Sequence, residues 1–330
     1  MKLSGFTFIR NGSKLHYPFI ESINSLLPIV EEYIVLICDS TDNTKDLIES
    51  IKNDKIKIYE SDWNKNRISG GNILSEKTNE SLRHVTGDYA FYLQGDELVH
   101  EKDYDNILKT LEDNFNNTKI KGFVFDYCHF LGGFFSYPKK EYVKDIFYYD
   151  HETRIIRNDK TVLSFGDATG FITKNGTPVS IENNNAVRIG GEAKIYHYGK
   201  ALKPEYNYNK ELNMRNIQYE KILARLKTWA FSFNPKVDKY ITKASGLRSF
   251  ADRDFLEFIE RGDKNSLLFH PQPIRDLANQ QNWDFSEFQN YNKNGSRFTK
   301  FLKLVIYRAV NEIITGIKKI KKKLRNLRNI

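Results

Sequence analysis

Strand-like and helix-like segments alternate regularly over residues 1–100, and this pattern constrains the fold more than any other feature. Four apolar runs predict strands, at residues 5–9, 33–38, 56–59 and 89–93. Three stretches between them predict helices, at residues 19–27, 44–52 and 70–85. Because consecutive parallel strands need crossover connections of about this length, the alternation predicts βαβ units in a doubly wound, mostly parallel sheet.

The pattern changes after residue 100. Longer aromatic strands are predicted at 122–131 and 153–157, with shorter ones between 179 and 195, which indicates an antiparallel extension of the same sheet. Helical patterns follow at 205–226 and 246–261. We therefore expect an α/β domain over residues 1–203, a helical extension over 204–295 and a C-terminal helix over 296–330.

The net charge of +9 is concentrated in residues 296–330, which hold eleven lysines and arginines and one acidic residue. Apolar residues recur there every three or four positions, which predicts a basic amphipathic helix. Such a helix suits an anionic membrane surface, or it packs on its own domain or on a second copy of the chain. Because the rest of the chain is close to neutral, nucleic acid is not an expected partner.

Cysteine usage and hydropathy bear on the cellular compartment. Cys38 and Cys128 are the two cysteines, and neither a CxxC motif nor a zinc spacing occurs. The N-terminal segment lacks the apolar core of a signal peptide, and the apolar run at 33–38 is too short to span a bilayer. We expect a cytoplasmic protein, which the tail would hold peripherally on the inner face of the cell membrane.

Polar residues follow three of the predicted strands, at 10–12, 39–42 and 94–97. In an open parallel sheet, ligands bind at the carboxyl ends of the strands, where the strand order reverses. Neither GxGxxG nor GxxxxGK[ST] occurs in the sequence, so dinucleotide oxidoreductases and P-loop enzymes lack support.

The strongest chemical signal is the run from Gln94 to Glu97. Hard cations such as Mg²⁺ or Mn²⁺ prefer carboxylate oxygens and often share phosphate oxygens of a substrate. Asp96 can supply such an oxygen, and Gly95 lets a phosphate approach the backbone. The run 67–71 precedes a helix, whose first amides can also hold phosphate. Either run is equally compatible with an ordinary polar turn.

Three motifs together resemble the GT-A-fold glycosyltransferases of family two: FTFIRNG at 6–12, DSTDNT at 39–44 and GDYAFYLQGDE at 87–97. The second motif is similar to the nucleotide-binding turn of that family, and the third to the segment with its metal-binding Asp-x-Asp. The resemblance is good over residues 4–100, looser up to 199, and absent over 205–330. It implies a Rossmann-like sheet flanked by helices, with the nucleotide-sugar donor half at 1–100 and the acceptor half at 101–203.

The resemblance also implies a set of site residues. The donor would be bound by Phe8, Arg10, Asn11, Asp39, Ser40, Arg67, Gly71, Gln94, Gly95 and Asp96. A divalent cation, Mn²⁺ or Mg²⁺, would be held by Asp96, Glu97 and His197. Since Gln94 stands where the family has its first aspartate, Asp96 would be the principal carboxylate, with Glu97 assisting. His197 would be a third ligand, a contact to the diphosphate, or a structural histidine.

The implied reaction is sugar transfer from a nucleotide-diphosphate sugar, with inversion by direct displacement. One carboxylate must accept the proton of the acceptor hydroxyl; Asp167, which lies in a glycine-rich turn, is the first candidate, and Glu152 is the second. The acceptor would be a glycan or a lipid-linked saccharide in cell-surface polysaccharide synthesis. The dense aromatic residues of 123–149 would form an acceptor platform or core packing.

Two alternatives compete with this interpretation. A nucleotidyltransferase of similar fold would need a glycine-rich loop after the first strand, which residues 10–14 do not provide. A GT-A protein without catalysis would instead act as a binding module whose basic tail engages nucleic acid or acidic lipid. The apolar stripe of the tail leaves a homo-oligomer open.

Overall fold

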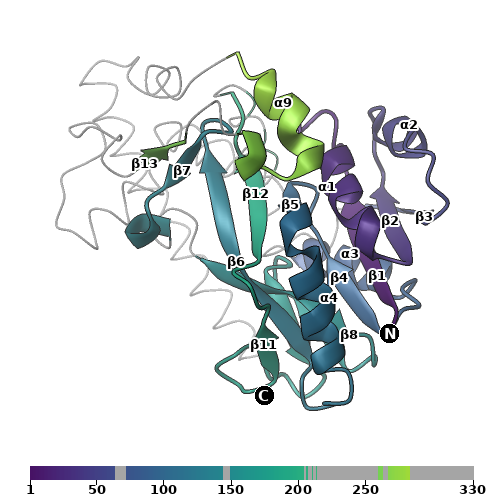
Figure 1. Cartoon of the computed structure of the whole chain (residues 1–330). Helices are drawn as coiled ribbons and strands as arrows, with labels where there is room; N and C mark the ends of the chain where they lie inside the picture. Colours follow the sequence, from purple (N-terminus) through teal and green to yellow (C-terminus); the bar gives the residue numbers. More distant parts are fainter. Residues whose placement is uncertain are drawn as a thin grey trace, which may run out of the picture.

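The chain in this computed structural model is described over residues 1–63, 72–143, 149–203 and 267–282, together with 206, 210, 213 and 259–262. Its main element is a nine-stranded mixed sheet in the order β3-β2-β1-β4-β8-β6-β12-β5, with β11 added to β6 (Figure 1). The first four strands of this order are parallel, as predicted; they are β1 (Leu3–Ile9), β2 (Glu32–Cys38), β3 (Ile56–Ser61) and β4 (Tyr89–Tyr92).

The second half of the sheet mixes directions. β8 (His151–Arg157) is antiparallel to both β4 and β6 (Gly122–Leu131), whereas β12 (Lys194–Lys200) and β11 (Ala186–Arg188) run parallel to β6. β5 (Glu97–Val99) closes this edge antiparallel to β12. The predicted antiparallel extension is therefore present, and the predicted α/β class, a mostly parallel sheet flanked by helices, is confirmed.

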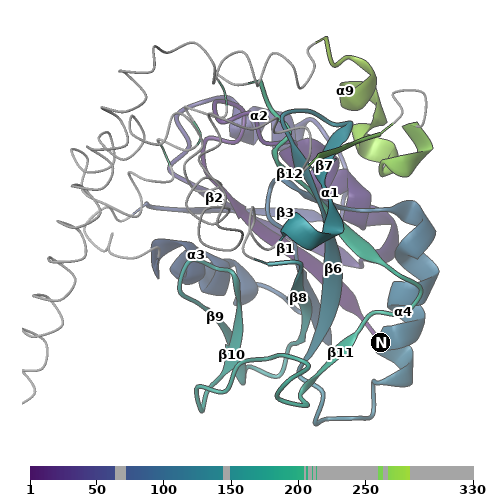
Figure 2. The same ribbon diagram turned by 90° about the vertical axis from the view of Figure 1, so that its left-hand side faces the viewer.

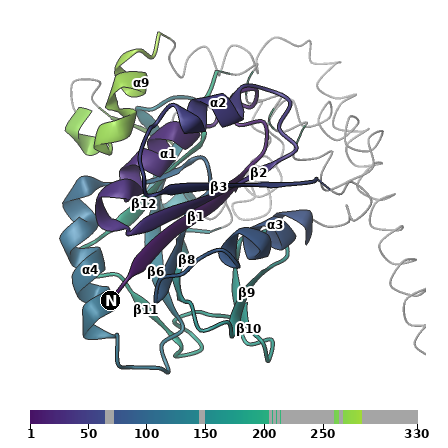
Figure 3. The same ribbon diagram turned by 90° about the vertical axis from the view of Figure 1, so that its right-hand side faces the viewer.

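Helices cover both faces of the sheet (Figures 2 and 3). One face carries α1 (Phe19–Leu26), α2 (Thr44–Glu49) and α4 (Tyr104–Asp113). The opposite face carries α3 (Asn72–Leu82) and the hairpin of β9 (Val162–Phe165) and β10 (Gly170–Thr173). A short α9 (Arg275–Asn279) lies beside the end of the sheet near α1.

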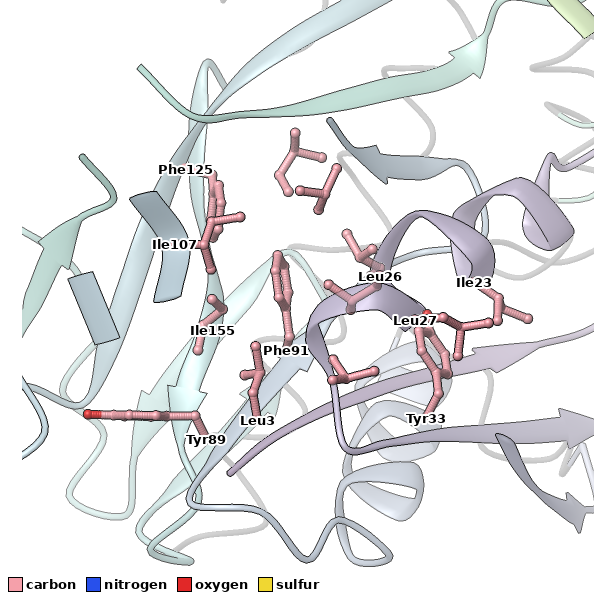
Figure 4. Close-up of a cluster of buried hydrophobic side chains, with 14 of the residues drawn as sticks. Leu3, Ile23, Leu26, Leu27, Tyr33, Tyr89, Phe91, Ile107, Phe125 and Ile155 are labelled. Atoms are coloured by element: carbon pink, nitrogen blue, oxygen red, sulfur yellow. The ribbon is translucent and has the colours of Figure 1, made fainter. Parts of the chain in front are cut away.

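Alternation along the strands divides the buried side chains between two cores. In β4, Tyr89 and Phe91 face the first core together with Leu26 of α1 and Ile107 of α4 (Figure 4). Ala90 and Tyr92 face the second core, where they meet Phe171 of the hairpin. A sheet buried on both faces has near-continuous apolar strands, which explains why the predicted runs were so uniform.

The remaining elements are short. They are η1 (Leu27–Ile29), η3 (Glu101–Asp103), η4 (Lys140–Tyr142), η6 (Leu267–Phe269), η7 (Gln272–Ile274), β7 (Ser136–Pro138) and β13 (Ile259–Arg261). The predicted helix at 246–261 is wrong at its end, because β13 pairs antiparallel with β7. The rest of that helix and the tail 296–330 lie outside the described residues. Among the described helices, none has the length and apolarity needed to cross a bilayer.

Candidate functional site

The turns after β1 and β2 are joined by hydrogen bonds at the carboxyl edge of the sheet. The backbone N–H of Asn11 donates to Ser40 Oγ (3.0 Å), and Asn11 Oδ1 accepts from the backbone N–H of Thr41 (2.8 Å). Asn11 and Asp39 both have positive φ values, 51° and 42°, a conformation that Asn and Asp tolerate better than most residues. The predicted nucleotide-binding residues of these two turns therefore lie together.

Arg10 adds a cationic group to this edge. Its guanidinium lies 5.0 Å from the ring centroid of Trp63, which follows β3 and also packs near Phe8. The Trp63 backbone N–H donates to Asp39 Oδ2 (2.7 Å), which links the ends of β2 and β3. Arg10 Nε is buried and has no hydrogen-bond partner within the described part of the chain. A buried donor of this kind is costly unless a ligand completes it.

The loop after β4 carries Gln94, Gly95 and Asp96 to the same edge. The Gln94 carbonyl accepts from Ser22 Oγ (3.1 Å), and its side-chain amide donates to the Ala168 carbonyl (3.4 Å) in the turn between β9 and β10. A Cβ at Gly95 would lie 2.9 Å from the terminal methyl of Ile9, so the Ile9 side chain would have to shift to admit a larger residue. β1 separates β2 from β4, which makes the β1/β4 boundary the point where strand order reverses.

Asp96 is buried between Lys210 and His197. Lys210 Nζ lies 2.8 Å and His197 Nε2 lies 3.7 Å from Asp96 Oδ2. Burial alone would raise the pKa of this carboxyl, but Lys210 and His197 hold it well below its usual range. Asp96 is therefore ionised and already neutralised by the chain itself.

Glu97 points into a different environment. Its carboxylate is fully buried and forms a two-pronged ion pair with Arg154, in which Nε donates to Oε2 (2.9 Å) and Nη2 to Oε1 (2.8 Å). The Tyr127 hydroxyl (2.7 Å) and the Gln94 backbone N–H (3.1 Å) donate to the same carboxylate. Four donors engage both oxygens, so Glu97 has a structural set of partners rather than those of a metal ligand.

The orientation of His197 is set by a second histidine. His129 Nε2 lies 3.1 Å from the Tyr149 carbonyl, which can only accept, so this nitrogen carries a proton. Burial and the neighbouring His197 keep the pKa of His129 well below its usual value. Nδ1 of neutral His129 is then an acceptor, and His197 Nδ1 donates to it (2.8 Å). This bond directs His197 Nε2 toward Asp96.

Gly199 leaves space for the Asp96–His197 pair. A Cβ at this position would lie 2.7 Å from Asp96 Oδ2 and closer still to His197 Nε2. We expect Gly199→Ala to lower the free energy of unfolding by about 1–3 kcal/mol, because one of the two side chains must move. Urea denaturation measures the change. Gly190→Ala is the matched control, since its Cβ would meet only Thr110 Oγ1 at 3.6 Å; equal losses in both variants would contradict the assignment.

The residues present do not fit a divalent cation well. Within the described ranges, no three His, Cys, Asp or Glu side chains converge as metal ligands. The three predicted ligands, Asp96, Glu97 and His197, do not face one common point. Glu97 is paired with Arg154, and Lys210 contacts the Asp96 oxygen that faces His197. The three-ligand set of Asp96, Glu97 and His197 is therefore not assembled, and the chemistry below uses no metal.

The two candidate bases occupy neighbouring segments with different exposure. Asp167 is exposed in the β9–β10 turn, where Gly166 and Ala168 both have φ of 61°. Glu152, on β8, is partly buried, and its Oε2 lies 3.5 Å from where a Gly170 Cβ would be. Burial, with smaller effects from Glu97 and Asp167, raises the pKa of Glu152 to about 7, although Arg154 and His151 oppose the shift. A carboxyl with this pKa can exchange protons near neutral pH.

Two predicted donor contacts and part of the predicted aromatic platform remain to be placed. Arg67 and Gly71 lie outside the described residues, as do the aromatic residues Phe147 and Tyr148. Phe123, Phe125 and Phe130 are fully buried, which supports core packing rather than an exposed platform for that part of the aromatic run.

Sequence reasoning missed the partners that tune the site. Lys210 is one of 51 lysines and arginines, and nothing in its local pattern distinguishes it. His129 is directly beside His197 in the parallel register of β6 and β12, a pairing that only the sheet reveals. The sequence signal available for this pairing was His129, a polar residue within the largely apolar run 122–131.

The sheet and its edge define an α/β protein whose polar turns gather where strand order reverses, between β1 and β4, the usual place for a ligand in such sheets. Residues 14–166 match the model of glycosyl transferase family 2. The match includes β2, β4 and the β9 strand of the hairpin. No curated protein sequence matches the chain.

Solved structures with a similar fold include glycosyltransferases. The crystal structure of S. aureus TarS is 13% identical, with a TM-score of 0.40 over 91% of this chain and 55% of that chain, so the chain spans about half of its length. S. aureus TarS 1-349 in complex with UDP-GlcNAc is 13% identical, with a TM-score of 0.39 over 96% and 92%. Glucosyl-3-phosphoglycerate synthase from Mycobacterium tuberculosis, in complex with Mn²⁺, UDP and its product, is 11% identical, with a TM-score of 0.37 over 69% and 79%. Because these scores are below 0.5, the assignment rests on the family match and the topology.

Proposed function

We propose that the chain is an inverting glycosyltransferase that moves a sugar from a nucleotide-diphosphate donor to a glycan or lipid-linked acceptor. One observation carries this proposal: the turns after β1, β2 and β4 share one edge, where Arg10 Nε is buried without a partner in the described structure and Asp96 is buried against Lys210. The family 2 match over residues 14–166 supports the same chemistry.

The reaction asks two things of the chain. The leaving diphosphate gains negative charge, which Arg10 at the donor edge would stabilise. The acceptor hydroxyl must lose a proton, and Glu152, with a pKa of about 7, is the base that we propose for it. Asp167, in the adjoining turn, is the alternative base. Synthesis of a cell-surface polysaccharide, membrane contact through residues 296–330 and self-association remain predictions.

A thermal-shift panel of UDP, GDP, dTDP and CMP, each with Mn²⁺, Mg²⁺ or EDTA, tests donor binding. We expect one nucleoside diphosphate to raise the melting temperature, because a ligand that binds only the folded state stabilises it. Arg10→Met should weaken that binding about tenfold through loss of a charge-assisted contact.

Arg83→Met is the matched control, because Arg83 is exposed just beyond α3. No shift with any nucleotide would instead favour the alternative of a binding module without catalysis.

A further inference from the structure

The ammonium group of Lys210 is the closest charged partner that the structure gives to Asp96. Lys210 Nζ donates to Asp96 Oδ2 and to the Gly199 carbonyl, both at 2.8 Å. Both side chains are about nine-tenths buried. The ring of Tyr17 lies 4.1 Å from Nζ, a cation–π contact. Three different groups thus fix the ammonium, which distinguishes it from a mobile surface lysine.

Lys210 and a divalent cation would compete for the Asp96 carboxylate. A hard cation needs several oxygen ligands, and a second positive charge in contact with one of them weakens its binding. Around Asp96, the alternatives are weak: the Gln94 side chain is an amide that donates to the Ala168 carbonyl, and Glu97 is held by Arg154. A metal at Asp96 would therefore lie beside the Lys210 ammonium, whose positive charge opposes its binding.

Neutralising Asp96 also matters for an anionic ligand. An unpaired carboxylate at this edge would repel a diphosphate, and the desolvated position would strengthen the repulsion. With Lys210 in contact, the pair carries no net charge. The chain's own ammonium thereby does what a bound metal would otherwise do for Asp96.

We propose that Lys210 is the resident cation of this site, that it keeps divalent metal off Asp96, and that the nucleoside diphosphate binds without metal. The metal-free binding of the nucleoside diphosphate rests on the proposed function, whereas the competition between Lys210 and metal does not. Lys210 is a positioning residue in this proposal, since it acts through Asp96.

Titrating Mn²⁺ into the ligand-free full chain tests the competition directly. The EPR signal of free Mn²⁺ reports how much of the metal is bound. We expect Lys210→Met to bind one Mn²⁺ at least about tenfold more tightly than the wild type, and Asp96→Asn in that background to abolish the gain. Lys210→Arg keeps the charge and should exclude Mn²⁺ as the wild type does. Lys109→Met removes an exposed lysine paired with Asp113 and is the matched control.

Equal Mn²⁺ affinity in the wild type and Lys210→Met would overturn the proposal. Because loss of a buried charge can impair folding, Lys210→Gln provides a second test: its amide can still donate to Asp96 and Gly199, and it should show the same gain. A purely structural role for Lys210 would not create a metal site in either variant.

A second experiment tests metal-free nucleotide binding with the nucleoside diphosphate that stabilises the wild type. Its thermal shift should be the same in EDTA and in Mn²⁺ for the wild type, and should depend on Mn²⁺ in Lys210→Met. A wild-type thermal shift that disappears in EDTA would contradict metal-free binding of the nucleotide. If no nucleotide shifts the wild type in any buffer, the proposed function fails, while the Mn²⁺ comparison still decides the role of Lys210.

Discussion

Replacing Arg154 with Met should cost about 3–5 kcal/mol of unfolding free energy, because it leaves the Glu97 charge buried without its partner. Both side chains are almost completely inaccessible, and no solvent can take over the lost interaction. Arg154 also donates through Nη1 to the Thr169 carbonyl (3.2 Å), so the substitution loosens the β9–β10 turn. Urea denaturation at neutral pH measures the loss.

A double-mutant cycle identifies the cause of that loss. Glu97→Gln removes the charge but can still accept from Tyr127, so we expect Arg154→Met/Glu97→Gln to recover a large part of the stability. The exposed pair Lys109–Asp113 should show a coupling below about 1 kcal/mol in the same kind of cycle. Additive losses for Arg154 and Glu97 would show that the ion pair is not what holds the two residues together.

Replacing Glu152 with Gln should lower the rate of sugar transfer by about 10²–10⁴-fold and leave donor affinity unchanged, because Gln cannot accept the acceptor proton. In the wild type, the rate should rise with pH through about 7, where Glu152 loses its proton. Release of the nucleoside diphosphate from the donor that the nucleotide panel identifies measures the rate. A large rate loss in Asp167→Asn, with Glu152→Gln close to wild type, would transfer the role to Asp167.

The same substitution should change stability in a pH-dependent way. The pKa of Glu152 is raised in the folded protein from 4.5 to about 7, so the folded state binds the proton more tightly than the unfolded state does. Stability from this group is therefore lost as pH rises from about 4.5 to 7, the reverse of an ordinary carboxylate. Glu152→Gln should raise the unfolding free energy at pH 8 by about 1–2 kcal/mol, allowing for partial exposure, and change it little at pH 4.

The local patterns predicted the strands of residues 1–100 well because most of them, such as β1, β2 and β4, are buried on both faces. Continuous apolar runs such as those of β2 and β4 stand out without any knowledge of their neighbours. The site at the ends of these strands was predictable for the same reason, since parallel strands bring their carboxyl ends to one edge. The strand at Ile259–Arg261 was mistaken for helix because its partner, β7, is far away in the sequence.

The candidate site residues also differ in whether the local sequence could identify them. Asn11, Asp39 and Ser40 could be singled out because they directly follow predicted strands, which is a local signal, and the family resemblance implied their role as donor contacts. The partners of Asp96 and Glu97 could not be found in that way: Lys210 and Arg154 are distant in sequence, and their roles depend on which carboxylate faces which cation. Two adjacent acidic residues that looked like one metal motif point into two separate electrostatic environments.

The sequence by itself determined the parallel α/β framework, its ligand edge and the turns that form it, because hydrophobic periodicity and turn residues act over a few positions. Only the tertiary structure decided the chemistry at that edge. Burial and the charges brought in from β5, β8, β12, the β9–β10 turn and Lys210 set the pKa of Glu152 and Asp96, and electrostatic interactions depend on distance in space rather than along the chain.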